Sequence, residues 1–227
     1  MNSLTAERNL NLDASYQVSQ KDINEYAKLG YTRINNICSK KELEPFREEL
    51  KEIVEEFKLK KAPLSERDLY GKAFLQISNI WERSETIKKF VLAERFGKIA
   101  ADLLGVDAVR LYHDQALYKE AGGGHTPWHQ DQFYWPTEGK TITMWMPLVD
   151  ASREMGLMEF IPNKNKSGML ANVNISESSD TFFKDLLKNE ALPVTTFDYM
   201  NAGSATFHCG WTPHRAGPNT TNNLREV

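Results

Sequence analysis

The chain has 227 residues, of which 41% are hydrophobic and 26% are charged, and its formal net charge is -3. This composition is typical of a globular protein with one core, and we expect a single domain over residues 1–227. The weak negative charge argues against nucleic acid and anionic membranes as partners, so we expect the partner to be a small molecule.

The spacing of the cysteines and the lack of a long apolar run indicate where the protein is located. No apolar run follows the N-terminal residues, and no stretch approaches the roughly 20 apolar residues of a membrane span. Cys38 and Cys209 lie far apart and match neither a disulfide framework nor a zinc-site spacing. We therefore expect a cytoplasmic protein, whose oligomeric state the sequence leaves open.

The first half of the chain has the pattern of a helical region. Residues 1–18 are polar and lack a periodic apolar face, which predicts a flexible arm. The best-marked helix begins with a capping box of Ser39 and Glu42, and its apolar residues recur at spacings of three and four up to Phe57. The other elements predicted in this half are a helix over 19–30, a strand over 31–34, a strand over 74–77 and a helix over 84–105.

The second half has the pattern of β structure. Short runs rich in β-branched and aromatic residues are bounded there by turn-forming residues. They predict strands over 109–118, 132–135, 141–149, 157–161, 194–199 and 205–211, with one helical insertion over 181–189. Helices followed by many short strands predict a mainly β fold, an antiparallel barrel or a double-sheet jelly roll, with the N-terminal helices packed on its outer face.

One segment of the second half carries residues that suit a metal ion. His129 and Asp131 lie two residues apart, so on an extended strand their side chains point to the same face. A third ligand is available near the C-terminus in His214. Two imidazoles and one carboxylate on one side of an ion are typical of non-haem Fe(II) oxygenases. Taken alone, the His-x-Asp pair also fits two hydrogen-bonding residues at a strand edge.

Four segments in order resemble the phytanoyl-CoA dioxygenase family. They are Trp-His-Gln-Asp at 128–131, the strand at 141–147, Gly-Leu-Met-Glu-Phe-Ile-Pro at 156–162, and the segment 203–225. The resemblance covers roughly residues 20–227. It implies a double-stranded β-helix and a dioxygenase that uses Fe(II), 2-oxoglutarate and O2 to hydroxylate, or otherwise oxidise, an unactivated carbon of a small molecule.

The resemblance also implies roles for individual residues. It makes His129, Asp131 and His214 the iron ligands, and it makes Arg225, at 225 - 214 = 11 residues beyond His214, the partner of the distal carboxylate of 2-oxoglutarate. Turn-forming residues at 217–220 allow the chain to reverse and return Arg225 to the metal. A guanidinium matches a carboxylate with two parallel hydrogen bonds. Related halogenases carry a small residue in place of the carboxylate, so Asp131 favours hydroxylation or another oxidative outcome.

Two further residues are candidates for the cosubstrate pocket, and four for the substrate pocket. Gln115 and Trp145 occupy strand positions where the family often lines the cosubstrate pocket, and ordinary packing is the alternative for both. A group of aromatic residues beside the metal motif suits an apolar or ring-bearing substrate, although such residues also fill small barrels. This group consists of Trp128, Phe133, Tyr134 and Trp135.

We expect structural roles for two of the other histidines and for the turn near the C-terminus. His208 could replace His214 on periodicity alone, but Asn219 and Arg225 follow His214 at the offsets of the family. We therefore expect His208 to be a core or supporting residue and Asn219 to fix the turn. His113 is expected to be an ordinary strand residue.

Two other functions remain open at the level of sequence. One is a catalytically silent jelly-roll binding protein that retains the metal ligands. The other is a cupin-like metalloenzyme that does not use 2-oxoglutarate, and Arg225 argues against it. The segment 162–166 departs from the usual turn of the family. The chain stops two residues after Arg225, whereas strands usually run about five or six residues, so we expect a truncated C-terminal strand.

Overall fold

The computed structural model describes residues 12–14 and 16–227, and the positions outside it belong to the arm predicted over 1–18. The described part of this arm is packed against the protein. Leu12 and Val18 are buried in the main core, and the backbone N–H of Arg95 donates to the carbonyl of Leu12 at 3.2 Å. The prediction of a flexible arm was therefore wrong for this part, because isolated apolar residues anchor it without forming a periodic face.

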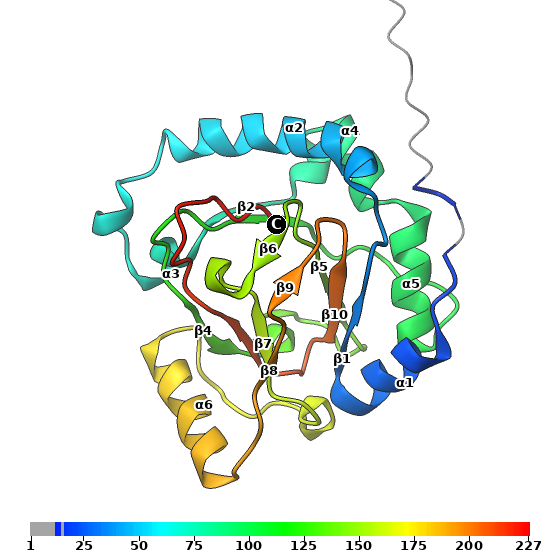
Figure 1. The fold of residues 1–227 in the computed structure, drawn as a ribbon. Coiled ribbons are helices and arrows are strands. Elements are labelled where there is room, and N and C mark those ends of the chain that lie inside the picture. The colour runs from blue at the N-terminus through cyan, green and yellow to red at the C-terminus, as the bar shows by residue number, and fades with distance from the viewer. Residues whose placement is uncertain (1–11, 15) are drawn as a thin grey trace, which may run out of the picture.

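The elements follow the expected order, with helices first and short strands afterwards (Figure 1). The helices are α1 (Gln20–Leu29), α2 (Lys40–Lys58), α3 (Leu69–Ala73), α4 (Glu85–Val91), α5 (Glu94–Leu104) and α6 (Glu177–Asn189). The strands are β1 (Tyr31–Ile34), β2 (Leu75–Ser78), β3 (Gln115–Tyr118), β4 (Thr126–His129), β5 (Ile142–Trp145), β6 (Ala151–Ser152), β7 (Met158–Phe160), β8 (Thr195–Thr196), β9 (Tyr199–Met200), β10 (Ala205–Cys209) and β11 (His214–Ala216). Short 3-10 helices lie at Leu64–Glu66, Ile80–Glu82, Asp131–Tyr134, Arg153–Met155 and Asn165–Ser167.

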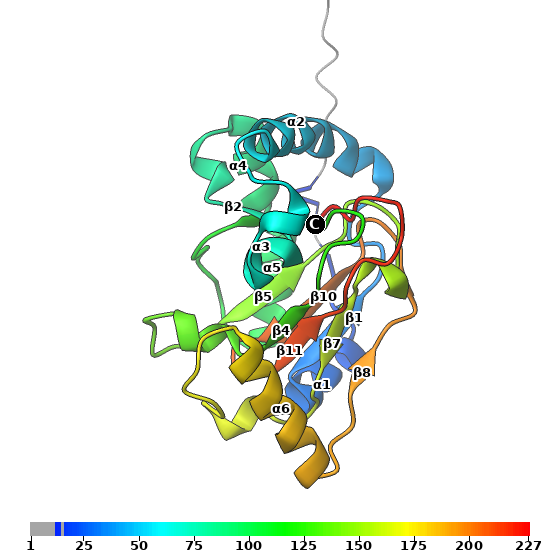
Figure 2. The same cartoon turned by 90° about the vertical axis from the view of Figure 1, so that its left-hand side faces the viewer.

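Antiparallel pairing joins the strands into two main sheets. One has the order β1-β10-β5 and the other the order β4-β11-β7-β8, while β2 pairs with β3 and β6 with β9. The helices α2 and α4 lie at one end of the strands, and α6 lies at the other end beside β4 (Figures 1 and 2). Helices outside a double layer of strands are the architecture that the sequence predicts.

Local sequence signals define several element ends correctly. The capping box of Ser39 and Glu42 is formed at the start of α2, and Gly30 ends α1 with φ at 86°, a conformation that favours glycine. The single helix predicted over 84–105 is instead two helices. Ala93, with φ at -55° and ψ at 129°, leaves the helical conformation between α4 and α5, and the rings of Phe90 and Phe96 on either side of this break lie 5.2 Å apart in the core.

The pattern over 132–135 predicts a strand, but residues 131–134 form a 3-10 helix. The side chain of Gln132 holds this turn, because its amide donates to the carbonyl of Thr137 and accepts from the hydroxyl of Thr141. Only 115–118 of the strand predicted over 109–118 is formed, and the run at 194–199 forms two short strands. The pattern did not indicate α3, β4 as a separate strand, β6 or β11.

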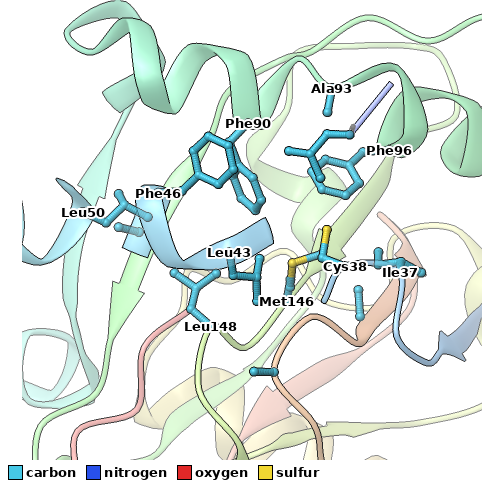
Figure 3. Close-up of a cluster of buried hydrophobic side chains, with 14 of the residues drawn as sticks. Ile37, Cys38, Leu43, Phe46, Leu50, Phe90, Ala93, Phe96, Met146 and Leu148 are labelled. Atoms are coloured by element: carbon cyan, nitrogen blue, oxygen red, sulfur yellow. The ribbon is translucent and has the colours of Figure 1, made fainter. Parts of the chain in front are cut away.

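The main core lies between the helices and the first sheet (Figure 3). The apolar face of α2 contributes Leu43, Phe46 and Leu50, and the ring of Phe46 lies 4.7 Å from that of Phe90 on α4. Burying each such side chain stabilises the fold by about 1.5–3 kcal/mol. The core thus attaches the helices to the strands that position the site. Among the described residues, no helix combines the length and the apolar character needed to cross a membrane.

Candidate active site

Two neighbouring strands bring two histidines opposite each other. His129 ends β4 and His214 begins β11, and the two are direct cross-strand partners whose rings lie 4.2 Å apart. Asp131 starts the 3-10 helix after β4, and its Oδ1 lies 3.5 Å from Nε2 of His129 and 3.4 Å from Nε2 of His214. The possible ligand atoms of the three residues all lie within 4.8 Å of one another, so the three can hold one metal ion.

The two imidazoles are oriented by backbone carbonyls. Nδ1 of His129 lies 2.8 Å from the carbonyl oxygen of Pro127, and Nδ1 of His214 lies 2.9 Å from that of Thr212. A neutral imidazole that donates from Nδ1 keeps the lone pair on Nε2 for a metal ion. Burial, together with the neighbouring His214, lowers the pKa of His129 and favours this neutral form.

Neighbouring side chains contact the second carboxylate oxygen of Asp131. Oδ2 accepts a hydrogen bond of 2.8 Å from the hydroxyl of Thr143, and it lies 3.2 Å from Nε2 of His208. Burial raises the pKa of Asp131, but the surrounding histidines, His214 above all, lower it well below its usual range. An ionised carboxylate with one oxygen engaged and the other facing two imidazoles suits a monodentate ligand. His208 thus contacts a candidate ligand residue, in keeping with the supporting role expected for it.

Arg225 lies in the same cavity as these three residues and is only 1% exposed. Its Nη1 donates to the carbonyl of Gly156, its guanidinium lies 5.4 Å from the ring centre of Trp145, and its Nε has no hydrogen-bond partner. Among the described residues, no carboxylate forms an ion pair with it, and burial lowers its pKa to about 9. A buried guanidinium with an unpaired N–H fits an anionic ligand such as the distal carboxylate of 2-oxoglutarate.

Asn219 fixes the turn that returns the chain to the site, as predicted. Its Nδ2 donates to the carbonyls of Lys119 and Asn223, at 3.2 and 2.7 Å, and its Oδ1 accepts from the backbone N–H of Thr221 at 3.0 Å. This network connects the end of β3 to the segment that carries Arg225.

The site opens into a cavity of about 920 Å³. Among the predicted pocket residues, Gln115, Tyr134, Trp135 and Trp145 line it. Trp128 does not, because its side chain is buried on the other side of β4, between Phe183 of α6 and the guanidinium of Arg215. Phe133 also lies outside the lining and packs edge-on against Tyr134. The structure therefore gives Trp128 and Phe133 a packing role.

Several lining residues were not predicted from the sequence. Thr126 lies across from Ala216 in the sheet, and its hydroxyl is buried without a partner. His113 lies in the coil before β3, not in a strand, and its ring is 4.5 Å from that of Trp135. Tyr70 and Gln76 join this wall, and the Tyr70 hydroxyl donates to Oε1 of Gln76 at 2.9 Å. Of these four residues, only Thr126 lies close to a sequence motif, two residues before the segment Trp128–Asp131.

Comparisons with known proteins identify the family of the chain. The family model described as phytanoyl-CoA dioxygenase matches residues 26–227. A protein of Stutzerimonas stutzeri named "Probable alpha-ketoglutarate-dependent hypophosphite dioxygenase" is 26% identical over 207 residues, which cover 86% of this chain and 71% of that protein. A methylphosphonate hydroxylase of Gimesia maris is 28% identical over 141 residues, covering 62% of this chain and 51% of the relative.

Solved structures share the fold. The non-haem alpha-ketoglutarate-dependent carbocyclase SnoK from nogalamycin biosynthesis superposes with a TM-score of 0.73 at 23% identity, covering 92% of this chain and 81% of SnoK. EctD from S. alaskensis, in complex with 2-oxoglutarate and 5-hydroxyectoine, superposes with a TM-score of 0.69 at 18% identity, covering 95% of this chain and 77% of EctD. The predicted jelly-roll fold with flanking helices is thereby confirmed.

The family match covers most of the chain, and the residues that the fold brings together fit Fe(II) and 2-oxoglutarate. The chain therefore belongs to the phytanoyl-CoA dioxygenase family and is an iron(II)- and 2-oxoglutarate-dependent dioxygenase.

Proposed function

We propose that His129, Asp131 and His214 bind Fe(II), that Arg225 binds the distal carboxylate of 2-oxoglutarate, and that the enzyme hydroxylates an unactivated carbon of a small molecule. The observation that carries this proposal is the location of the three ligand residues and an unpaired, buried guanidinium in one cavity. When bound, iron with 2-oxoglutarate and O2 supplies the oxidant for a strong carbon–hydrogen bond.

The residues of the chain prepare the site for this reaction. The two histidines present Nε2 lone pairs, because their Nδ1 atoms are engaged by carbonyls. Arg225 and the free hydroxyl of Thr126 offer hydrogen-bond donors to the cosubstrate, and Trp145 supports the guanidinium. We also assign Gln115 of β3 to the cosubstrate pocket, because its side chain lines the cavity. Burial of these groups excludes water and strengthens their interactions with a charged ligand.

The substrate side of the cavity suits a molecule with a ring and polar substituents. Its wall combines aromatic surface with amide, phenol and imidazole groups, from Tyr70, Gln76, Tyr112, His113, Tyr134 and Trp135. A cavity of about 920 Å³ is of the size that holds a drug-sized ligand. The two curated relatives are named for hypophosphite and methylphosphonate, which are much smaller, so both compounds belong in a substrate screen beside ring-bearing molecules.

A direct test is an anaerobic titration of the protein with Fe(II) and 2-oxoglutarate. We expect the weak visible charge-transfer band of the chelate. Asp131→Ala and His214→Ala should abolish the band, whereas His208→Ala should retain most of it, because His208 contacts Asp131 and is not one of the three residues that can hold the metal. Absence of the band in the unaltered protein would contradict the proposal. Succinate release in the presence of candidate substrates then identifies the substrate.

We also propose that the enzyme works in the cytoplasm. Cys38 and Cys209 are both free thiols, and burial raises the pKa of Cys38 to about 12. Such thiols suit a reducing compartment. Localisation of a tagged full chain by fractionation tests this, and recovery with secreted proteins would contradict it.

A further inference from the structure

A fully buried lysine lies beside the proposed cosubstrate anchor. Lys119 directly follows β3 and is 0% exposed. Its backbone exchanges two hydrogen bonds with that of Arg225, at 2.9 and 3.0 Å, so the two residues are direct cross-strand partners. Such partners carry their side chains on the same face of the sheet. Because Arg225 lines the cavity, the side chain of Lys119 lies on the same inner face of these paired segments, although Lys119 does not itself line the cavity.

The amine of Lys119 is enclosed by the glycine loop between β3 and β4. Nζ donates to the carbonyl of Gly124. The stem packs against Gly123, where an added Cβ would lie only 2.9 Å from Cγ of Lys119. Among residues 12–14 and 16–227, no carboxylate forms an ion pair with this amine. An enclosed amine whose hydrogen-bond partner is a neutral carbonyl has little that favours its charged form.

The carboxylates adjacent to this pair in the chain are engaged by other cations. Glu120 pairs with Arg67 and lies 3.5 Å from Nζ of Lys58. Glu226 accepts two hydrogen bonds from Arg47 of α2. Neither carboxylate is available to neutralise a charge on the inner face.

The other elements around the loop also bring no anion to the amine. From α3, the carbonyl of Lys72 accepts from the backbone N–H of Gly124 at 2.7 Å. On the far side of the loop, His125 lies 3.7 Å from Asp180 of α6, which is paired with Lys184. The charged group that acts on Lys119 is therefore the guanidinium of Arg225. Burial, with a further contribution from this guanidinium, lowers the pKa of Lys119 to about 6.

We propose that Lys119 takes up a proton when 2-oxoglutarate binds at Arg225, so that cosubstrate binding is coupled to proton uptake. The inference rests on the proposed function, in which Arg225 anchors the distal carboxylate. A negative charge brought to the inner face stabilises an ammonium beside it. In this step a buffer acid transfers one proton to the lone pair of Nζ, so that an N–H bond forms and the conjugate base of the buffer is released.

Linkage fixes the sign of the pH dependence. A group that gains a proton on binding makes the complex more favourable at lower pH. The affinity for 2-oxoglutarate should therefore fall as pH rises from about 6, the pKa of Lys119 in the free protein, towards its higher pKa in the complex, by at most about tenfold per pH unit. The carboxylates of 2-oxoglutarate are ionised throughout this range and do not contribute the proton.

Calorimetry under anaerobic conditions tests the proposal without turnover. The Fe(II)-loaded protein is titrated with 2-oxoglutarate near neutral pH in two buffers of different ionisation enthalpy, which yields the number of protons taken up. We expect an uptake approaching about one proton for the unaltered protein and none for Lys119→Met. Lys51→Met, which replaces an exposed lysine of α2, is the matched control and should retain the uptake.

The outcomes distinguish a failure of the role of Lys119 from a failure of the proposed function on which it rests. Binding of 2-oxoglutarate without proton uptake, or with an uptake that Lys119→Met leaves unchanged, would overturn the role of Lys119 and leave the proposed function standing. Failure of 2-oxoglutarate to bind would overturn both. The pH dependence of the dissociation constant in the unaltered protein needs no variant, so a constant affinity across the pH range would also refute the coupling.

Discussion

Replacing Lys119 with methionine should make the protein more stable near neutral pH. The pKa of Lys119 is about 6 in the folded protein against 10.5 for an ordinary lysine, so at pH 7 folding removes a proton that the unfolded chain holds. The pH lies 3.5 units below 10.5, and each unit corresponds to about 1.4 kcal/mol, which gives a cost of about 5 kcal/mol. Methionine avoids this cost but leaves the carbonyl of Gly124 without its donor, at about 1–3 kcal/mol. The expected net gain is about 2–4 kcal/mol.

Urea denaturation at several pH values measures this gain and its sign. Because the unfolded chain binds more protons, the free energy of unfolding of the unaltered protein should rise with pH between about 6 and 10.5. The advantage of Lys119→Met should therefore shrink by about 1.4 kcal/mol per pH unit over that range. The control Lys51→Met should show neither effect. A destabilised Lys119→Met protein, or a difference that does not change with pH, would refute the reasoning.

Three further changes test individual contacts. Arg225→Lys should raise the dissociation constant for 2-oxoglutarate by about tenfold or more, because an ammonium lacks the planar pair of donors, while Fe(II) binding is retained; calorimetry measures both, and an unchanged cosubstrate affinity would count against the anchor. Thr143→Ala should weaken Fe(II) binding by about 10–100-fold, because Asp131 loses the bond at Oδ2, whereas Thr143→Ser should restore it; equal affinity in all three proteins would show that the bond does not position Asp131. Ser39→Ala should lower the free energy of unfolding by about 1 kcal/mol in urea denaturation, and no loss of stability would mean that the capping box does not stabilise α2.

The features that were predicted best from the sequence are those that depend on residues close together in the chain. The capping box at Ser39 and the left-handed Gly30 are local chemistry, and both form as expected. The order of helices and strands, and the jelly roll with helices outside it, also followed from the pattern. The three residues proposed as metal ligands were predicted mainly by resemblance, because His129 and His214 meet only through the pairing of β4 with β11.

The features that the sequence did not predict depend on contacts between distant segments. The aromatic run at 132–135 has strand propensity, but Gln132 anchors it as a helical turn through Thr137 and Thr141. Trp128 lies next to His129 in the chain, yet its side chain packs under α6, which the motif does not reveal. Lys119 is polar in sequence and fully buried in the fold, because its cross-strand partner and the glycine loop enclose it.

The central place of β10 in the first sheet has a consequence for folding kinetics. Tyr31 of β1 pairs with His208 of β10, and the two residues are 208 - 31 = 177 positions apart. Pairing over such a separation has a high loop-closure entropy and is typical of slow folding. During synthesis, β1 is made long before its partner and remains an unpaired edge that can associate with other chains. We therefore expect β1 to need protection by chaperones until β10 has been translated.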